Sequence, residues 1–285
     1  SGKRRSLDQT IQDNETTFRD YAPGFDIRPW DDPNGLDDLL DKVDESFDAV
    51  IAVGGDGTIN EVAKRLIGSR LALGVIPTGS GNGLARHLRI SRKPEVALNQ
   101  LLTAEIMDMD VGDFDVRLFL NSAGIVLDAE VAKIFDDKDL GGMAAYISLT
   151  VSQYLKFRGF ACDLIVAGHE ESPCRDMLVV GIANGPQWGG GAKIAPLSRI
   201  SDGYLGAVLL EKPAIIDVPL LATQLFNGSI HKHPNVRNVK GKVFEIRRAQ
   251  AGIAQVDGEP LLKGTHIPVQ IKEKAIKVLA PRIVK

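Results

Sequence analysis

A run of glycines that encloses a carboxylate is the segment best suited to chemistry: Gly54-Gly55-Asp56-Gly57-Thr58-Ile59-Asn60-Glu61. Glycine lets backbone N–H groups come close to an anion, and Asp56 could reach a metal ion or a hydroxyl proton. The spacing matches neither the P-loop of nucleoside triphosphatases nor the G-x-G-x-x-G loop of dinucleotide-binding proteins. The pattern predicts an anion-binding loop, and a plain glycine turn capped by Thr58 is the alternative.

A second glycine-rich loop follows further along the chain, Pro77-Thr78-Gly79-Ser80-Gly81-Asn82-Gly83. The hydroxyl and amide groups of Thr78, Ser80 and Asn82 suit phosphate and ribose oxygens. Each loop follows a short apolar run, at 48–53 and 71–76, of the kind that buried parallel strands show. Because ligands of open α/β sheets bind at the carboxyl ends of the strands, we expect both loops to line one crevice.

The elements that position these loops alternate between strand and helix. Apolar residues at helical spacing predict helices at 36–47 and 59–67, and Pro94 at a first turn predicts a helix over 94–102. Strand–helix–strand order with short links is typical of a doubly wound α/β domain. We place the end of this domain near residue 112, so that it covers residues 1–112.

From residue 106 onward the apolar residues follow a period of two, which indicates strands. Helical patterns interrupt this rhythm at 128–135 and 143–157, and an amphipathic helix at 218–226 either packs on the core or faces lipid. The rest predicts a mostly antiparallel β-sandwich domain over 113–285. The expected strands lie at 160–167, 177–183, 205–210, 243–246, 253–256 and 269–271.

Composition excludes several classes of protein. The chain has 285 residues, of which 44% are hydrophobic and 25% charged, and a formal net charge of −3. These values argue against a disordered chain and against a basic protein that coats nucleic acid. Two cysteines, Cys162 and Cys174, rule out a disulfide scaffold, and no apolar run is long enough to span a bilayer. We therefore expect a cytoplasmic protein that binds no nucleic acid.

The two loops resemble those of a known family. Gly-Gly-Asp-Gly-Thr followed by Pro-x-Gly-Ser-Gly-Asn resembles the catalytic domain of the diacylglycerol kinase and sphingosine kinase superfamily, and is most similar to the bacterial soluble lipid kinases. Later segments share the resemblance, which covers nearly the whole chain: Gly124-Ile125-Val126-Leu127-Asp128, Asn184-Gly185-Pro186-Gln187-Trp188, Ser201-Asp202-Gly203-Tyr204 and Val256-Asp257-Gly258-Glu259-Pro260.

The resemblance implies an ATP- and Mg²⁺-dependent kinase that phosphorylates a lipid hydroxyl, with ATP between an α/β nucleotide-binding domain and a β-rich domain. Diacylglycerol, a sphingoid base or a related lipid would be the acceptor, presented at a membrane surface. Both glycine loops, from Gly54 to Glu61 and from Gly79 to Asn82, would hold the nucleotide. Peripheral attachment to the membrane and a homodimer are both compatible with this interpretation.

The resemblance also assigns roles to single residues. Glu259 would be the general base, and Asp56 a catalytic or metal-organising residue. Asp202, with backbone carbonyls at Arg199 and Tyr204, matches a structural magnesium loop. Asp128 matches a position that contacts the substrate headgroup.

Three segments depart from the family pattern. Its usual opening strand, which ends in Asn-Pro-x-Ser-Gly, has no counterpart at Ser1-Gly2-Lys3. Gly83 stands where many bacterial members have Asp, and Arg28-Pro29-Trp30 stands near a Thr that often meets the nucleotide. Two other functions stay open: an NAD kinase-like phosphotransferase, which shares the Gly-Gly-Asp-Gly loop, and a catalytically silent nucleotide-binding regulator that docks on membranes.

Overall fold

The computed structural model describes residues 26, 28, 30, 35–43, 46–126, 159–167, 169–170, 173–188 and 191–282. The chain divides into two compact units. The first comprises Ser1–Met109 together with Lys274–Lys285, and the second comprises Asp110–Glu273. The helices predicted at 128–135 and 143–157 lie outside the described residues. Among the described helices, none is long and apolar enough to cross a membrane.

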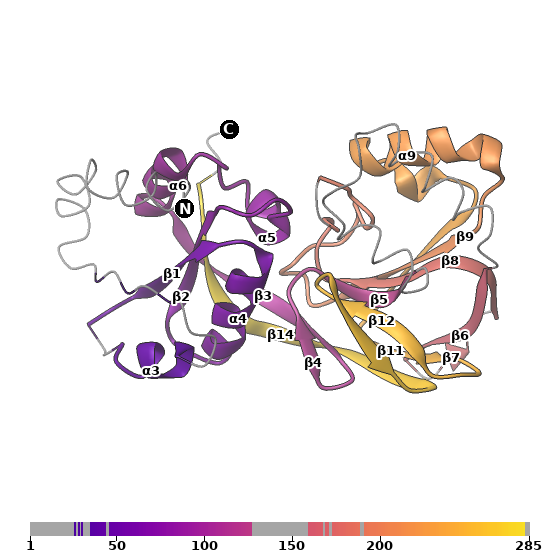
Figure 1. Cartoon of the computed structure of the whole chain (residues 1–285), viewed down its shortest axis with the longest axis horizontal. Coiled ribbons are helices and arrows are strands. Elements are labelled where there is room, and N and C mark those ends of the chain that lie inside the picture. The colour runs from indigo at the N-terminus through magenta and orange to yellow at the C-terminus, as the bar shows by residue number, and fades with distance from the viewer. Residues whose placement is uncertain are drawn as a thin grey trace. The chain divides into compact units, whose positions relative to one another are not determined.

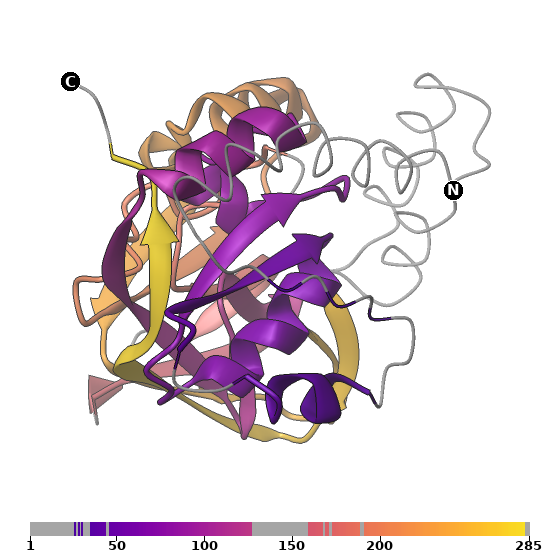
Figure 2. The same cartoon turned by 90° about the vertical axis from the view of Figure 1, so that its left-hand side faces the viewer.

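The first unit is built on two parallel strands, β1 (Ala49–Gly54) and β2 (Ala72–Pro77). Every residue of β2 is buried, as expected for a strand that is covered on both faces. In Figure 2 the helix α6 lies on one side of these strands and α3 and α4 lie on the other. The predicted α/β class is therefore confirmed. The helices of this unit are α3 (Leu36–Leu40), α4 (Asp56–Leu66), α5 (Gly83–His87) and α6 (Pro94–Leu102).

The last strand, β14 (His266–Ala280), is much longer than the strand predicted at 269–271. Its C-terminal part belongs to the first unit, where Lys277 and Val278 pair in parallel with Ala72 and Leu73 of β2. Periodicity did not extend the strand this far, because the charged run Lys272-Glu273-Lys274 interrupts the apolar alternation.

The second unit is a β-sandwich, in agreement with the predicted fold class (Figure 1). Neighbouring strands within each of its groups pair antiparallel. One group contains the first part of β14, β11 (Val243–Arg247), β6 (Phe160–Val166), β7 (His169–Glu170) and a hairpin of β4 (Arg117–Phe119) with the end of β3 (Glu105–Phe114), whose residues from Asp110 onward belong to this unit. The other contains β10 (Val236–Gly241), β9 (Leu205–Glu211), β8 (Cys174–Ala183), β5 (Ser122–Val126), β12 (Gly252–Val256) and β13 (Glu259–Lys263).

The strand β9 shows how the sandwich is packed. Its alternate residues Leu205, Ala207 and Leu209 belong to the main core. Val208 and Leu210 point the other way and pack in a second cluster with Leu221 of α9 (Val218–Asn227). The helix α9 therefore covers the outer side of this group of strands, as Figure 1 shows. Two short 3-10 turns flank the helix, η1 (Ile215–Asp217) and η2 (Ile230–Lys232).

Candidate active site

The two glycine-rich loops of the first unit meet at their backbones. The N–H of Thr78 donates to the carbonyl of Gly54 at 2.8 Å, so the second loop is tied to the end of β1. A β-carbon built on Gly79 would lie 2.6 Å from the Cα of Gly55, which is too close for any side chain. Glycine at position 79 is therefore what allows the loops that follow β1 and β2 to touch.

The carboxylate of Asp56 bridges the two loops. Its Oδ2 accepts the N–H of Asn82 and its Oδ1 accepts the N–H of Gly83, each at 2.7 Å. These N–H groups stand at the start of α5, where the helix itself supplies no acceptor. A negative charge is also favourable at that end of a helix. Asp56 thus holds the second loop in place through both of its oxygens.

Asn82 closes the second loop on itself. It is fully buried and has a φ of 55°, in the left-handed region that Asn tolerates better than most residues. Its Oδ1 accepts the N–H of Gly79 at 3.1 Å, and its Nδ2 donates to the carbonyl of Gly79 at 2.7 Å. Arg86 adds a bond from Nε to the carbonyl of Gly81 at 2.8 Å. The loop is therefore shaped before any ligand arrives.

The electrostatics of α5 are simple at its C-terminal end. Burial lowers the pKa of His87 below its ordinary value, and the positive charge of Arg89 lowers it further. The imidazole is consequently neutral at pH 7, and Arg86 is the charged residue of α5 that contacts the loop.

The predicted nucleotide contacts differ in their access to solvent. Gly57 and Ser80 are exposed, whereas Ile59 and Asn60 are buried in the packing of α4. Glu61 is paired with Lys64, whose Nζ lies 2.7 Å from Oε1. The side chains of Ile59 and Asn60 thus serve the fold. The first N–H groups of α4, which lack partners within the helix, are the groups suited to an anion.

The second unit carries the other predicted catalytic residue, Glu259, next to a tight turn. Asp257 and Gly258 have φ values of 50° and 89° and link β12 to β13, which is the geometry of a type I′ hairpin. Glu259 is the first residue of β13 and is exposed. Within the described part of the chain, no hydrogen bond or ion pair engages its carboxylate. The carboxylate is therefore available to accept a proton.

Pro260 does not interrupt the pairing of β12 with β13. It lies inside β13, opposite Gln255 of β12. The strand β13 is at the edge of its sheet, so the missing N–H of proline breaks no ladder bond on the outer side.

Asp257 is a further site residue, to which the sequence assigned no role of its own. Its carboxylate accepts three backbone N–H groups, from Leu120 at 2.7 Å, Asn121 at 2.8 Å and Ser122 at 3.0 Å. These bonds fix the hairpin that carries Glu259 to the start of β5. An Asp-Gly pair directly after the predicted strand at 253–256 was the signal available in the sequence.

The residues predicted to hold a structural magnesium ion are arranged differently. Asp202 Oδ1 accepts the N–H of Tyr204 at 3.2 Å, and Asp202 Oδ2 lies 2.9 Å from Nζ of Lys240. The same Nζ lies 4.6 Å from the centre of the Tyr204 ring, while Arg199 is exposed. The described residues contain no group of three or more His, Cys, Asp or Glu side chains that could hold a metal. As arranged, this loop does not fit a metal ion, because the ammonium group of Lys240 already neutralises Asp202.

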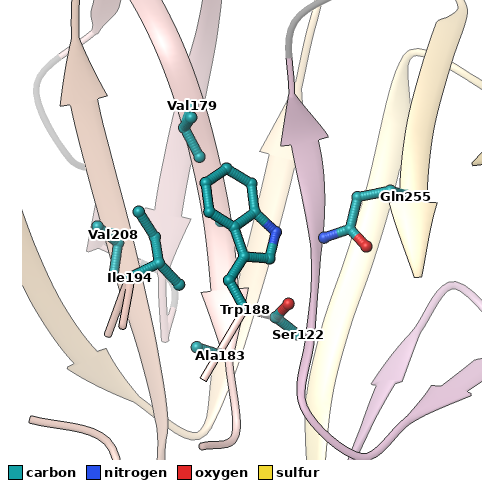
Figure 3. Close-up of a pocket in the computed structure, with 8 residues that line it drawn as sticks. Ser122, Val179, Ala183, Trp188, Ile194, Val208 and Gln255 are labelled. Atoms are coloured by element: carbon teal, nitrogen blue, oxygen red, sulfur yellow. The ribbon is translucent and has the colours of Figure 1, made fainter. Parts of the chain in front are cut away.

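Two other residues belong to the segments that carry the family resemblance, Asp128 and Trp188. Asp128 lies outside the described residues. Trp188 lines a small cavity of the second unit and packs on Val179, Ile194 and Val208 (Figure 3). Its indole thus belongs to the cluster that also receives α9, in accordance with a packing role.

Comparison with known families covers both units. Residues 1–114 match the family described as the diacylglycerol kinase catalytic domain. Residues 121–280 match the family described as the YegS C-terminal NAD kinase beta sandwich-like domain.

Individual proteins show the same relationship. The Serratia proteamaculans protein named Probable lipid kinase YegS-like is 33% identical over 81% of this chain and 76% of its own length. The protein of the same name from Pseudomonas aeruginosa PAO1 is 30% identical over 88% of this chain and 83% of its own.

Solved structures agree on the fold. A crystal structure of a diacylglycerol kinase from Bacillus anthracis superposes with a TM-score of 0.73 at 16% identity, and covers 98% of this chain and 93% of its own. An NAD kinase from Archaeoglobus fulgidus in complex with ATP gives a TM-score of 0.52 at 14% identity, and covers 99% and 91%. Taken with the sequence matches of both units, these findings show that the chain belongs to the YegS-like lipid kinase family, which has a diacylglycerol kinase catalytic domain.

Proposed function

We propose that this protein transfers the γ-phosphoryl group of ATP to a hydroxyl group of a lipid such as diacylglycerol or a sphingoid base. Beside the family relationship, one observation carries the proposal: Gly55 and Gly79 meet at the start of α4, whose first N–H groups are unpaired within the helix. Backbone N–H groups in such a cradle bind phosphates. Mg²⁺ would enter as part of the MgATP substrate and neutralise charge on the phosphates.

In this proposal the acidic residues have separate roles. Glu259 accepts the proton of the lipid hydroxyl. At the same time the hydroxyl oxygen forms a bond to the γ-phosphorus, and the bond from that phosphorus to the leaving oxygen of ADP breaks. Asp56 is a positioning residue, because both of its oxygens hold the second glycine loop. Phosphoryl transfer depends mainly on such positioning and on charge neutralisation.

Replacing Glu259 by Gln tests the role of the base. The variant keeps the shape of the side chain and removes the proton acceptor, so kcat should fall by about 10²–10⁴-fold while the affinity for ATP barely changes. Glu105→Gln is a control for the loss of an exposed carboxylate at the start of a strand, and it removes in addition the surface pair with Arg282. Full activity of Glu259→Gln would move the role of the base to Asp56.

The acceptor can be identified with labelled ATP and a total lipid extract, with NAD⁺ supplied as acceptor in a parallel reaction. A labelled lipid product would support the proposal and name the substrate. Labelled NADP⁺ alone would favour an NAD kinase, whose fold this chain also shares at a TM-score of 0.52. Bound ATP without any labelled product would favour a silent nucleotide-binding regulator.

A further inference from the structure

The turn η1 and the helix α9 expose apolar side chains on the second unit. Ile216 is 81% exposed, Phe226 is 59% exposed and Leu220 is 51% exposed. The helix Val218–Asn227 contains no charged residue, and Asp217 precedes it. Residues three or four positions apart lie on the same side of a helix. Among the exposed positions of η1 and α9, 216, 219, 220, 223 and 226 follow this spacing and so form one outward face, which we call the α9 face.

The opposite side of α9 anchors the helix to the sandwich. Leu221 is buried with Val208 and Leu210 of β9, and Leu225 packs against the same cluster. The outward side chains are therefore not needed to hold the helix in place. Surface helices ordinarily present polar and charged residues to water, and an exposed apolar patch with a polar rim marks an interaction site.

Two lysines, Lys193 and Lys232, lie near the C-terminal end of the α9 face. The backbone N–H of Lys193 donates to the carbonyl of Leu225 at 2.9 Å, and a β-carbon built on Gly228 would lie 3.7 Å from Lys193 Nζ. Lys232, in the turn that follows, is exposed. From 218 to 244 the sequence contains no Asp or Glu. Of the basic residues in that stretch, Arg237, Lys240 and Lys242 pair with acids of other segments, whereas Lys232 lies in η2 next to the helix.

We propose that the α9 face docks on a bilayer that contains anionic lipids. Ile216, Leu220 and Phe226 would insert below the headgroups, and Lys193 and Lys232 would meet the negative headgroups. This inference rests on the proposed function, because a kinase with a lipid acceptor must reach its substrate in the membrane. A two-fold contact with a second copy is disfavoured, because it would place the same lysines of both copies at one interface.

Vesicle sedimentation without ATP tests this docking directly. The wild-type protein should bind phosphatidylcholine vesicles more tightly when they contain phosphatidylglycerol, and added salt should weaken that binding. The double variant Ile216→Asp/Phe226→Asp should lower the partition coefficient by about tenfold or more, because burial of two large apolar side chains is lost. Lys193→Glu/Lys232→Glu should remove the preference for anionic vesicles.

Val116→Asp is the matched control for a lost surface hydrophobe. Val116 is 87% exposed in the turn between β3 and β4, far from α9 in sequence, and its φ of 64° suits Asp. This variant should bind vesicles as the wild type does. Equal melting temperatures of all variants would show that the changes act on binding and not on folding.

The outcomes separate docking from catalysis. Unchanged vesicle binding by Ile216→Asp/Phe226→Asp, or no binding by the wild type, would overturn the proposal. A wild-type dimer that this variant dissociates would assign the face to a second copy of the chain. The rate on a short-chain lipid in detergent should be the same for variant and wild type. The absence of any phosphorylated lipid, with vesicle binding retained, would refute the kinase proposal and leave the docking surface standing.

Discussion

The acidic side chains of the two units differ in their hydrogen-bond partners, and the partners indicate what each acid can do. Asp56 accepts two backbone N–H groups and Asp257 accepts three, so both position the chain around them. Asp202 is paired with Lys240. Glu259 is exposed and has no such partner among the described residues. A general base must be free to receive a proton, and this requirement favours Glu259.

Removing the Asp56 carboxylate should disconnect the two glycine loops. Asp56→Ala leaves the N–H groups of Asn82 and Gly83 without their acceptor, at a cost of about 1–3 kcal/mol for each group that stays buried. Both ATP binding and turnover should be lost, and denaturant unfolding should show the lower stability. Asp56→Asn retains one oxygen acceptor, so its ATP affinity and its stability should lie between those of the wild type and Asp56→Ala. Wild-type ATP affinity in Asp56→Ala, with a normal melting curve, would contradict the bridging role.

Among the elements, the loop before β9 is joined to β10 through the ion pair of Asp202 with Lys240. Gly203 is held in addition by its N–H bond to Asp110 Oδ2 at 2.7 Å. The positive charge beside Asp202 in this structure is that of Lys240. A cation on a side chain stays with the protein, so the stability of this loop should not depend on dissolved metal.

Melting curves in Mg²⁺ and in EDTA, without nucleotide, should therefore coincide for the wild type. Lys240→Met should lower the melting temperature by at most about 2–4 °C, because an exposed ion pair contributes no more than about 1 kcal/mol. Lys272→Met, which breaks a separate pair with Asp113, is the matched control. A wild-type melting temperature that rises with Mg²⁺ and no longer does so in Asp202→Ala would show that the loop binds the metal after all.

At the scale of the whole molecule, the first unit includes the C-terminal segment of the chain, Lys274–Lys285. Ile276 and Val278 of β14 are buried, and Val278 pairs with Leu73 of β2. The carbonyl of Ala275 accepts the N–H of Gly68 at 2.8 Å. The strand that carries one glycine loop therefore depends on residues that follow the entire β-sandwich in sequence.

Deleting residues 274–285 should unfold the first unit and leave the second folded. Loss of two buried side chains costs about 3–6 kcal/mol, which is a large part of the stability of a typical domain. Limited proteolysis should then cut within residues 46–109 and spare the sandwich, and ATP binding should disappear. Deletion of residues 281–285 is the control, since the interaction of the described residues that it removes is the surface pair of Arg282 with Glu105. Unchanged protection of 46–109 in the longer deletion would contradict this dependence.

Local sequence patterns were enough to predict the class of the fold and most of its elements. Local patterns carry that information: unbroken apolar runs for β1 and β2, a period of two for the sandwich strands, and Pro94 for the start of α6. The glycines at the ends of these strands likewise predicted two loops that meet, as Gly55 and Gly79 do, because the backbone freedom such loops need is visible in residue type.

Which groups face each other follows from the tertiary contacts and not from local sequence patterns. Asp56 with the start of α5, Asp257 with the start of β5, and Lys240 with Asp202 are contacts between segments far apart in sequence, and no local period encodes them. The same holds for the final part of β14. Its charged residues interrupt the apolar alternation typical of a strand, yet it pairs with β2 in the folded chain. Long-range contacts of this kind depend on the packing of the whole chain, because the register of the strands decides which charged and polar side chains come together.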